Sequence, residues 1–305
     1  MDETVVDWPA LPLEAWEPTK QTLHRYCQML GKVRLALAPY RNHWWHVTLR
    51  VGTRGLETGP LPLPDGRRVE LTLDLVDHAV IGRDSTGASG RFPLRHPFAC
   101  ADFHQQLFTL LHDLGVEVDI DTTPYDLEGP AFTDDRVHDS YDAGAVERYW
   151  TVLRRSADVL ETFGSRFNGK QSPVQLFWHS FDLAMARFSG RRAPVAPGAS
   201  LVEADAYSHE VIAFGFWAGD ANVRFPAYYS YTAPAPDGLT SQPLQPDAAA
   251  WDVAAGTAQL AYDDVRTAHD PSETLLAFFE SAYRAGATAA GWDLDDLATR
   301  VAPPR

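Results

Sequence analysis

Apolar residues recur at helical spacing in four stretches of the chain. One stripe runs from Leu23 to Leu37, and comparable stripes cover residues 103–114, 146–163 and 275–283. Spacing of three or four residues puts apolar side chains on one face of a helix. The pattern therefore predicts four amphipathic helices. Asp270 is expected to cap the last of them, with Pro271 as its first residue.

Alternation of apolar and polar residues marks the expected strands. Residues 69–75 alternate strictly, which is typical of a strand with one buried face in an antiparallel sheet. Shorter or less regular segments predict strands at 43–51, 80–81, 116–120, 174–178, 181–188, 209–217, 227–231 and 259–262. Loops are expected at 84–90, 191–200 and 234–246. Strands joined by hairpins predict an α+β fold with mainly antiparallel sheets flanked by helices.

The expected elements follow a similar order in the two halves of the chain. Three pairs of identical residues share a constant offset of 133 positions: Trp45 and Trp178, His46 and His179, Arg54 and Arg187. A length of 305 residues also suits roughly two domains. We therefore expect an internal duplication, with coincidence as the alternative. Its two similar α+β halves would be residues 1–123 and 143–305, joined by a Pro-, Gly- and Asp-rich segment at 124–142.

Charge and cysteine content narrow the expected partners. The chain carries 26 Lys and Arg against 41 Asp and Glu, a net charge of −15 that disfavours nucleic acid and anionic membranes. No apolar run reaches the roughly 18 residues of a membrane span. Cys27 and Cys100 fall in predicted helices, so we expect buried free thiols and a reducing cytoplasm. The sequence does not indicate an oligomeric state.

Two motifs fail as cofactor or metal sites. The segment from Gly164 to Ser172 resembles a phosphate-binding loop, but Gln171 occupies the Ser/Thr position and the helix precedes the loop. His43 and His46 are three residues apart on a predicted strand, so their imidazoles would point to opposite faces. We expect no cofactor and no metal.

Two polar clusters remain as candidate chemistry. The first contains Lys170, Ser172, Asp182, Arg187 and Arg191, and the second contains Tyr207, His209 and Glu210. Paired arginines suit a carboxylate or phosphate. His209 with a carboxylate, either Glu210 or Asp182, would be a catalytic acid–base pair. The alternative is an ion-pair network that only stabilises the fold.

Large aromatic side chains crowd the predicted strands, either in a core or around a pocket. We expect a cleft near the junction of the halves that recognises a small anionic or aromatic molecule. Its expected ligand contacts are Lys170, Ser172, Arg187, Arg191, Tyr207, His43, Trp45 and Trp178. One alternative is a metal-independent hydrolase or transferase that uses the His/carboxylate pair. Another is a scaffold whose aromatic strands bind a partner protein.

Several stretches resemble a bacterial domain-of-unknown-function family, number 5996. They are residues 31–37, 42–45, 172–174, 180–184, 187–191, 207–211 and 229–231, and the resemblance extends from Trp8 to Asp293. The family pattern commonly has histidine at Gln175, a small residue at His179 and proline at Ala218. The first departure weakens any expected role for position 175. The resemblance implies no activity, but its stretches include both polar clusters.

Overall fold

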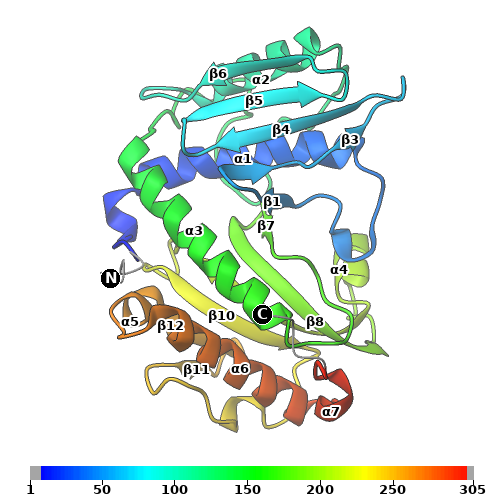
Figure 1. Cartoon of the computed structure of the whole chain (residues 1–305), viewed down its shortest axis with the longest axis vertical. Helices are drawn as coiled ribbons and strands as arrows, with labels where there is room; N and C mark the ends of the chain where they lie inside the picture. The colour runs from blue at the N-terminus through cyan, green and yellow to red at the C-terminus, as the bar shows by residue number, and fades with distance from the viewer. Residues whose placement is uncertain (1–7, 301–305) are drawn as a thin grey trace. The chain divides into compact units, whose positions relative to one another are not determined.

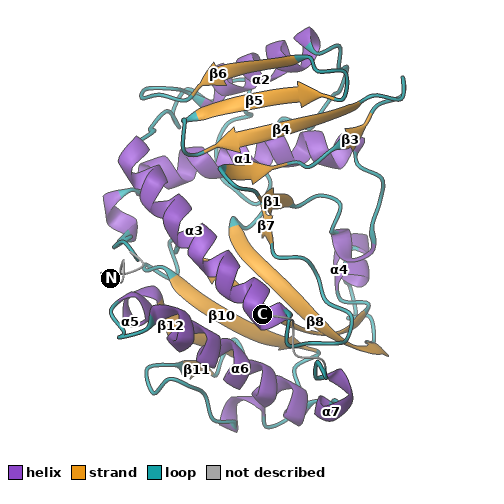
Figure 2. Ribbon diagram, viewed as in Figure 1, coloured by secondary structure: helices purple, strands orange, loops and turns teal. Residues whose placement is uncertain are grey.

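A computed structural model describes residues 8–300 of the chain, which form two compact units (Figures 1 and 2). Unit 1 contains the described residues of Met1–Leu13, Thr151–Val174 and Leu183–Arg305. Unit 2 contains Glu14–Trp150 and Gln175–Asp182. Residues 124–142 therefore lie within unit 2. The halves expected at 1–123 and 143–305 stay a prediction.

Unit 2 is built on an antiparallel sheet with the strand order β7-β1-β2-β4-β5-β6, in which β3 also pairs with β4. Its strands are β1 (Leu49–Val51), β2 (Gly55–Glu57), β3 (Leu61–Pro62), β4 (Arg68–Asp74), β5 (Ala79–Asp84), β6 (Ser89–Pro93) and β7 (Gln175–Phe177). Its helices are α1 (Glu17–Leu37), α2 (Cys100–Asp113) and the short η2 (Asn42–Trp44). The 3-10 helix η1 (Leu13–Ala15) and helix α3 (Ala143–Gly164) each have residues in both units.

Unit 1 contains strands in the order β8-β9-β10-β12-β11. They are β8 (Asp182–Arg192, of which Asp182 belongs to unit 2), β9 (His209–Trp217), β10 (Ala227–Ala233), β11 (Ala250–Asp252) and β12 (Thr257–Ala261). Its further helices are α4 (Leu201–Ala206), η3 (Leu239–Ser241), α5 (Tyr262–Arg266), α6 (Pro271–Ala289) and α7 (Leu294–Leu297). Rings from α3, β9 and α6 meet in its core, where Phe163 lies 4.8 Å from Phe214 and 5.7 Å from Phe279.

The four predicted helices form where the apolar stripes lie. Helix α6 begins as expected, because the Asp270 carboxylate accepts the backbone N–H of Glu273 at 3.0 Å and Pro271 occupies the first turn. In α1 the inward-facing Gly31 is necessary, since a Cβ there would lie 2.2 Å from Cδ1 of Trp178. The mixed α+β class and the antiparallel pairing are confirmed.

The structure corrects several predicted elements. Residues 43–48 are not part of a strand, because His43 and Trp44 adopt left-handed φ angles of 58° and 60°. Residues 116–120 form no strand. Only the ends of the loops expected at 84–90 and 191–200 belong to strands, Asp84 to β5, Ser89 and Gly90 to β6, and Arg191 and Arg192 to β8, whereas residues 85–88 and 193–200 lie outside the strands as predicted. Helices α4, α5 and α7 were not predicted, since each is at most six residues long and shows no periodic stripe.

The described residues provide no sign of the expected internal duplication. In unit 2, β1, β2, β4, β5 and β6 are neighbours in chain order, whereas in unit 1 β12 lies between β10 and β11. The identical residues that are 133 positions apart also lie in different kinds of secondary structure. Arg54 is in the turn after β1, while Arg187 is in the middle of β8.

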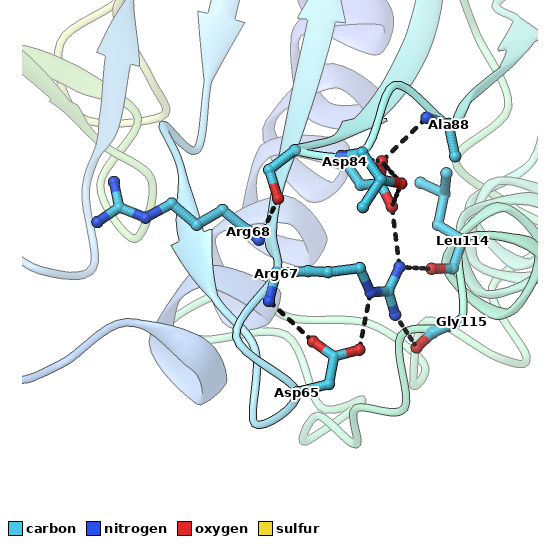
Figure 3. Close-up of polar contacts among 9 residues, drawn as sticks. Asp65, Arg67, Arg68, Asp84, Ala88, Leu114 and Gly115 are labelled. Atoms are coloured by element: carbon cyan, nitrogen blue, oxygen red, sulfur yellow. Dashed lines mark hydrogen bonds and ion pairs between the residues drawn. The ribbon is translucent and has the colours of Figure 1, made fainter.

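An arginine holds the end of α2 against the sheet of unit 2, as Figure 3 shows. The Arg67 guanidinium donates to the carbonyls of Leu114 and Gly115 at 2.8 and 3.1 Å. It also donates to the carboxylates of Asp65 and Asp84 at 2.7 and 2.9 Å. A cation at this point offsets the negative end of the helix dipole.

Two further sequence expectations concern single features. Cys27 and Cys100 are buried free cysteines, as predicted. Over residues 8–300, every helix is too short or too polar to cross a membrane.

Candidate functional site

Strand alternation divides the predicted site residues of unit 1 between two faces. Tyr228 packs toward the helices, because its hydroxyl lies 2.9 Å from that of Ser156 on α3 and its ring lies 6.0 Å from that of Phe279 on α6. Neighbouring residues on a strand point to opposite sides. Tyr229 and Tyr231 therefore lie on the other side, away from α3 and α6, which we call the Tyr229 face.

Arg187 is on the helix side and is buried in a cage of aromatic rings. Its side chain is only 1% exposed, and its guanidinium carbon lies 3.4 Å from the ring centre of Phe163 and 4.4 Å from that of Tyr283. One amino group donates to the carbonyl of Phe163 at 2.5 Å. Burial lowers the pKa of Arg187 to about 10, so the group stays charged at neutral pH. This environment makes Arg187 a packing residue, and a ligand would have to open the cage to reach it.

Glu210 and Arg191 form a second assembly on the helix side. Arg191 donates to one Glu210 carboxylate oxygen from Nε at 2.8 Å and from Nη2 at 2.6 Å. The hydroxyl of Ser189 and the indole N–H of Trp292 donate to the same oxygen at 2.8 and 3.0 Å. Arg191 also donates to the carbonyl of Ala290 at the end of α6. The arrangement is of the kind expected for the alternative hypothesis, an ion-pair network that stabilises the fold.

Since Glu210 faces the helices, its neighbour His209 faces the other way. The predicted pairing of these two side chains is therefore absent from the geometry. His209 instead lies near Lys170, Arg192 and Asp205, and burial followed by the two cations lowers the pKa of its imidazole. Its Nδ1 lies 3.1 Å from the Ser208 hydroxyl. A neutral imidazole in this position can either donate or accept a hydrogen bond.

Lys170 lies on the same face as His209. Its ammonium is 5.0 Å from the ring centre of Phe188, which alternation places opposite Arg187. Partial burial lowers the pKa of Lys170, and the nearby Asp205 carboxylate opposes this shift. One Asp205 oxygen, Oδ2, is buried without a hydrogen bond among the described residues. The cluster thus combines two basic side chains with a carboxylate that has spare accepting capacity.

Three tyrosines form a row on the Tyr229 face. The rings of Tyr229 and Tyr231 stack with centres 6.2 Å apart, and the hydroxyls of Tyr231 and Tyr207 are 3.1 Å apart. Tyr229 covers Gly215, its register partner on β9, where a Cβ would lie 2.5 Å from the phenol ring. Tyr207 is 41% exposed. The row therefore offers aromatic surface and hydroxyl groups to a ligand.

The remaining predicted residues of the first cluster serve local structure. Ser172 is buried, and its hydroxyl accepts the backbone N–H of Ala186 at 2.9 Å, which ties the segment before β7 to β8. Asp182 accepts a hydrogen bond from the hydroxyl of Ser180. Asp182 belongs to unit 2 and His209 to unit 1, so a functional pairing of the two stays a prediction.

Unit 2 holds the three other predicted ligand contacts. Trp178 is buried in the core, and its indole N–H donates to the carbonyl of Val47 at 2.6 Å. His43 is also buried, whereas Trp45 is half-buried, and their ring centres lie 5.2 Å apart. Trp178 is therefore a core residue, whereas the Trp45 side chain is partly accessible.

Among the described residues, neither metal-ligating side chains nor a hollow of unit 2 point to the predicted site residues. Within residues 8–300, no three His, Cys, Asp or Glu side chains come together as metal ligands. A hollow of about 250 Å³ lies between β6 and α2 and is lined by both polar and apolar side chains, such as Arg91 and Asp113 beside Phe92 and Leu110. None of the predicted site residues lines it.

Two side chains near Lys170 and His209 were not among the predicted site residues. Asp205 lies on the unpredicted helix α4, and Arg192 lies in a segment that was predicted to be a loop. Extending the alternation of β8 by a few residues would have placed Arg192 opposite Arg191. No sequence signal placed Asp205 beside Lys170.

Comparison with known proteins finds one family. Residues 8–299 match the model of DUF5996, described as a family of unknown function. No curated protein and no solved structure matches the chain.

Proposed function

Because the chain belongs to the DUF5996 family, for which no function is established, we propose a function from the site alone: recognition of a small aromatic molecule that carries an anionic group. The observation that carries this proposal is the placement of Lys170 and His209 on the same sheet face as the row of Tyr207, Tyr231 and Tyr229. The proposed site lies wholly within unit 1.

The cluster matches the two parts of such a ligand. An aromatic ring stacks on or against the exposed phenol of Tyr207, and edge or offset contacts of this kind add about 0.5–1.5 kcal/mol beyond surface burial. Lys170 and Arg192 attract the anionic group. In a chain of net charge −15, a concentration of basic groups on one sheet face selects for anions.

Thermal denaturation with a ligand panel tests the proposal. The probes are 4-hydroxybenzoate and phenyl phosphate, with neutral phenol as the comparison. We expect the two anions to raise the melting temperature by mass action, and phenol to do so less. The part of this shift that exceeds the shift given by acetate or inorganic phosphate should disappear in Lys170→Gln and persist in Tyr125→Phe, an exposed tyrosine of unit 2. Equal shifts in Lys170→Gln and the wild type would refute the site.

A second candidate is acid–base catalysis at the same cluster. It is favoured by Asp205, whose carboxylate is near enough to His209 to raise the pKa of the imidazole against the effect of burial. In this role His209 would take the proton and Asp205 would orient the ring. Hydrolysis of nitrophenyl esters or phosphates should then be lost in His209→Ala while the ligand-induced thermal shift remains.

A further inference from the structure

Three arginines gather in unit 2 around the turn that follows α1. Arg34 is only 6% exposed, and its Nε donates to the carbonyl of His46 at 2.6 Å. Its Nη1 donates to the carbonyl of Thr58. These two bonds fix the guanidinium plane.

The Arg50 side chain reaches the same peptide segment from β1. It crosses the next residue, Gly59, where a Cβ would lie 2.9 Å from Cζ and Nη1 of Arg50. Two guanidinium groups therefore flank residues 58 and 59, and Gly59 (φ 64°) leaves the space they need. Arg41 lies near enough that both it and Arg50 contribute, after burial, to lowering the pKa of Arg34.

The neighbouring acidic group does not neutralise this cluster. Glu57 is the register partner of Arg50 on β2, and its carboxylate lies over Gly52, where a Cβ would lie 2.0 Å from Oε1. Burial and Glu70 raise the pKa of Glu57, and the opposing effect of Arg50 does not offset them. Within residues 8–300, no carboxylate lies within ion-pair distance of Arg34, Arg41 or Arg50. The three guanidinium groups repel one another, and Glu57 offsets this repulsion only in part. A bound anion would therefore lower the electrostatic free energy of the folded unit.

A buried polar side chain points to the same place. Gln175 is the register partner of Arg50 on β7, so both side chains share one face of the sheet. Gln175 is 3% exposed, and its Oε1 accepts the hydroxyl of Thr48 at 2.7 Å. Its Nε2 is buried without a hydrogen bond among the described residues. The indole N–H of Trp44, in the strained turn beside Arg34, is likewise buried without a hydrogen bond among the described residues.

We propose that Arg34, Arg41 and Arg50 form a binding site for a small oxyanion, a phosphate or carboxylate group, beside the His43–Trp44 turn. Arg34 is the fixed, buried contact. Arg50 and Arg41 are the exposed contacts that close around the anion. Guanidinium groups suit this role because they bond oxyanions through two parallel donors. The site lies within unit 2 and does not depend on the function proposed for unit 1.

The test measures anion binding by the full-length chain. Inorganic phosphate, sulfate and acetate are compared with chloride at equal ionic strength, by thermal denaturation and titration calorimetry. We expect phosphate to raise the melting temperature, and Arg50→Gln to weaken phosphate binding by about tenfold or more, as expected for one lost charge-assisted hydrogen bond. A stronger response to acetate than to phosphate would assign the site to carboxylates.

Three variants make the result decisive. Arg91→Gln removes an exposed arginine on β6 and should keep the full phosphate response. Lys170→Gln should keep it too, which separates this site from the one in unit 1. Without phosphate, Arg50→Gln should melt no lower than the wild type, because it relieves repulsion around Arg34. The proposal is overturned if phosphate has no effect beyond chloride, or if Arg50→Gln responds like the wild type.

Discussion

Buried basic side chains in this acidic chain are held by different kinds of partner. Aromatic rings surround Arg187, whereas Arg34 and Lys32 donate to backbone carbonyls. In each case the charge keeps favourable electrostatic contacts after it leaves water. Burial alone therefore does not identify a functional arginine. Buried donors without a hydrogen bond occur at both arginines, Nε of Arg187 itself and Nε2 of Gln175 near Arg34, so Arg34 is distinguished by the two further arginines that lie close to it.

His24 makes the stability of unit 2 depend on pH. Its Nε2 lies 2.9 Å from the carbonyl of Trp178 and 3.2 Å from that of His179, so this nitrogen carries the proton and donates. Gln28 Nε2, 3.3 Å away, is also a donor, and the two carbonyls are the better partners. Burial, followed by the charge of Lys20, lowers the pKa of His24 from 6.5 to about 3.

The consequence is a loss of stability as the pH falls below 6.5. Between about pH 3 and 6.5 the unfolded chain binds a proton at this position and the folded chain does not, so acid favours unfolding. From pH 6.5 to 5 this residue should lower the unfolding free energy by about 2 kcal/mol. Urea denaturation followed by tryptophan fluorescence should show this slope in the wild type and in His112→Gln, an exposed control. A slope that is unchanged in His24→Gln would contradict the assignment.

At the scale of elements, the C-terminal ends of helices α2 and α6 are held to their sheets in the same way. Arg67 bonds the end of α2 and Asp84, and Arg191 bonds the end of α6 and Glu210. Each pairs a sheet carboxylate with the helix's last carbonyls through one guanidinium. Glu210 belongs to a polar cluster that resembles a catalytic site in the sequence. In the structure its carboxylate holds Arg191 at the end of α6, which is a structural role.

The cap of α6 gives an element-scale prediction. Asp270→Ala removes the acceptor for the Glu273 backbone N–H and should lower the unfolding free energy by about 1 kcal/mol. Ser272→Ala, in the same first turn but without the capping contact, should change it by less than about 0.5 kcal/mol. Chemical denaturation of both variants measures the difference. Equal effects would mean that tertiary packing, not the cap, sets the start of the helix.

The long periodic elements could be predicted from the sequence, and the site could be predicted only in part. Four apolar stripes gave α1, α2, α3 and α6, because burial of one face dominates helix placement. The turn at His43 and Trp44 could not be predicted, since left-handed φ angles in two non-glycine residues depend on tertiary contacts. Lys170, Tyr207 and His209 were predicted to lie near one ligand, and their role in a site stays a prediction. Their grouping with Arg191 and Glu210 ignored strand alternation.

At the scale of the whole molecule, net charge opposes folding. The chain carries −15 at pH 7, and its exposed ion pairs, such as Arg136 with Asp102, contribute little in water. Repulsion among excess carboxylates is long-ranged and is screened by salt, whose Debye length falls from about 30 Å at 0.01 M to about 8 Å at 0.15 M. Screening should therefore stabilise the protein.

We expect the melting temperature at pH 8 to rise by about 2 °C or more between 0.01 and 0.15 M sodium chloride, a shift that corresponds to roughly 1 kcal/mol for a chain of this size. Near pH 5.1, where the net charge vanishes, the rise should be much smaller. Arg50→Gln should retain the rise at pH 8, because general screening does not need the arginine cluster. Loss of the rise in that variant would instead assign it to chloride bound at Arg34, Arg41 and Arg50. A fall in melting temperature with salt would mean that the surface ion pairs outweigh the repulsion.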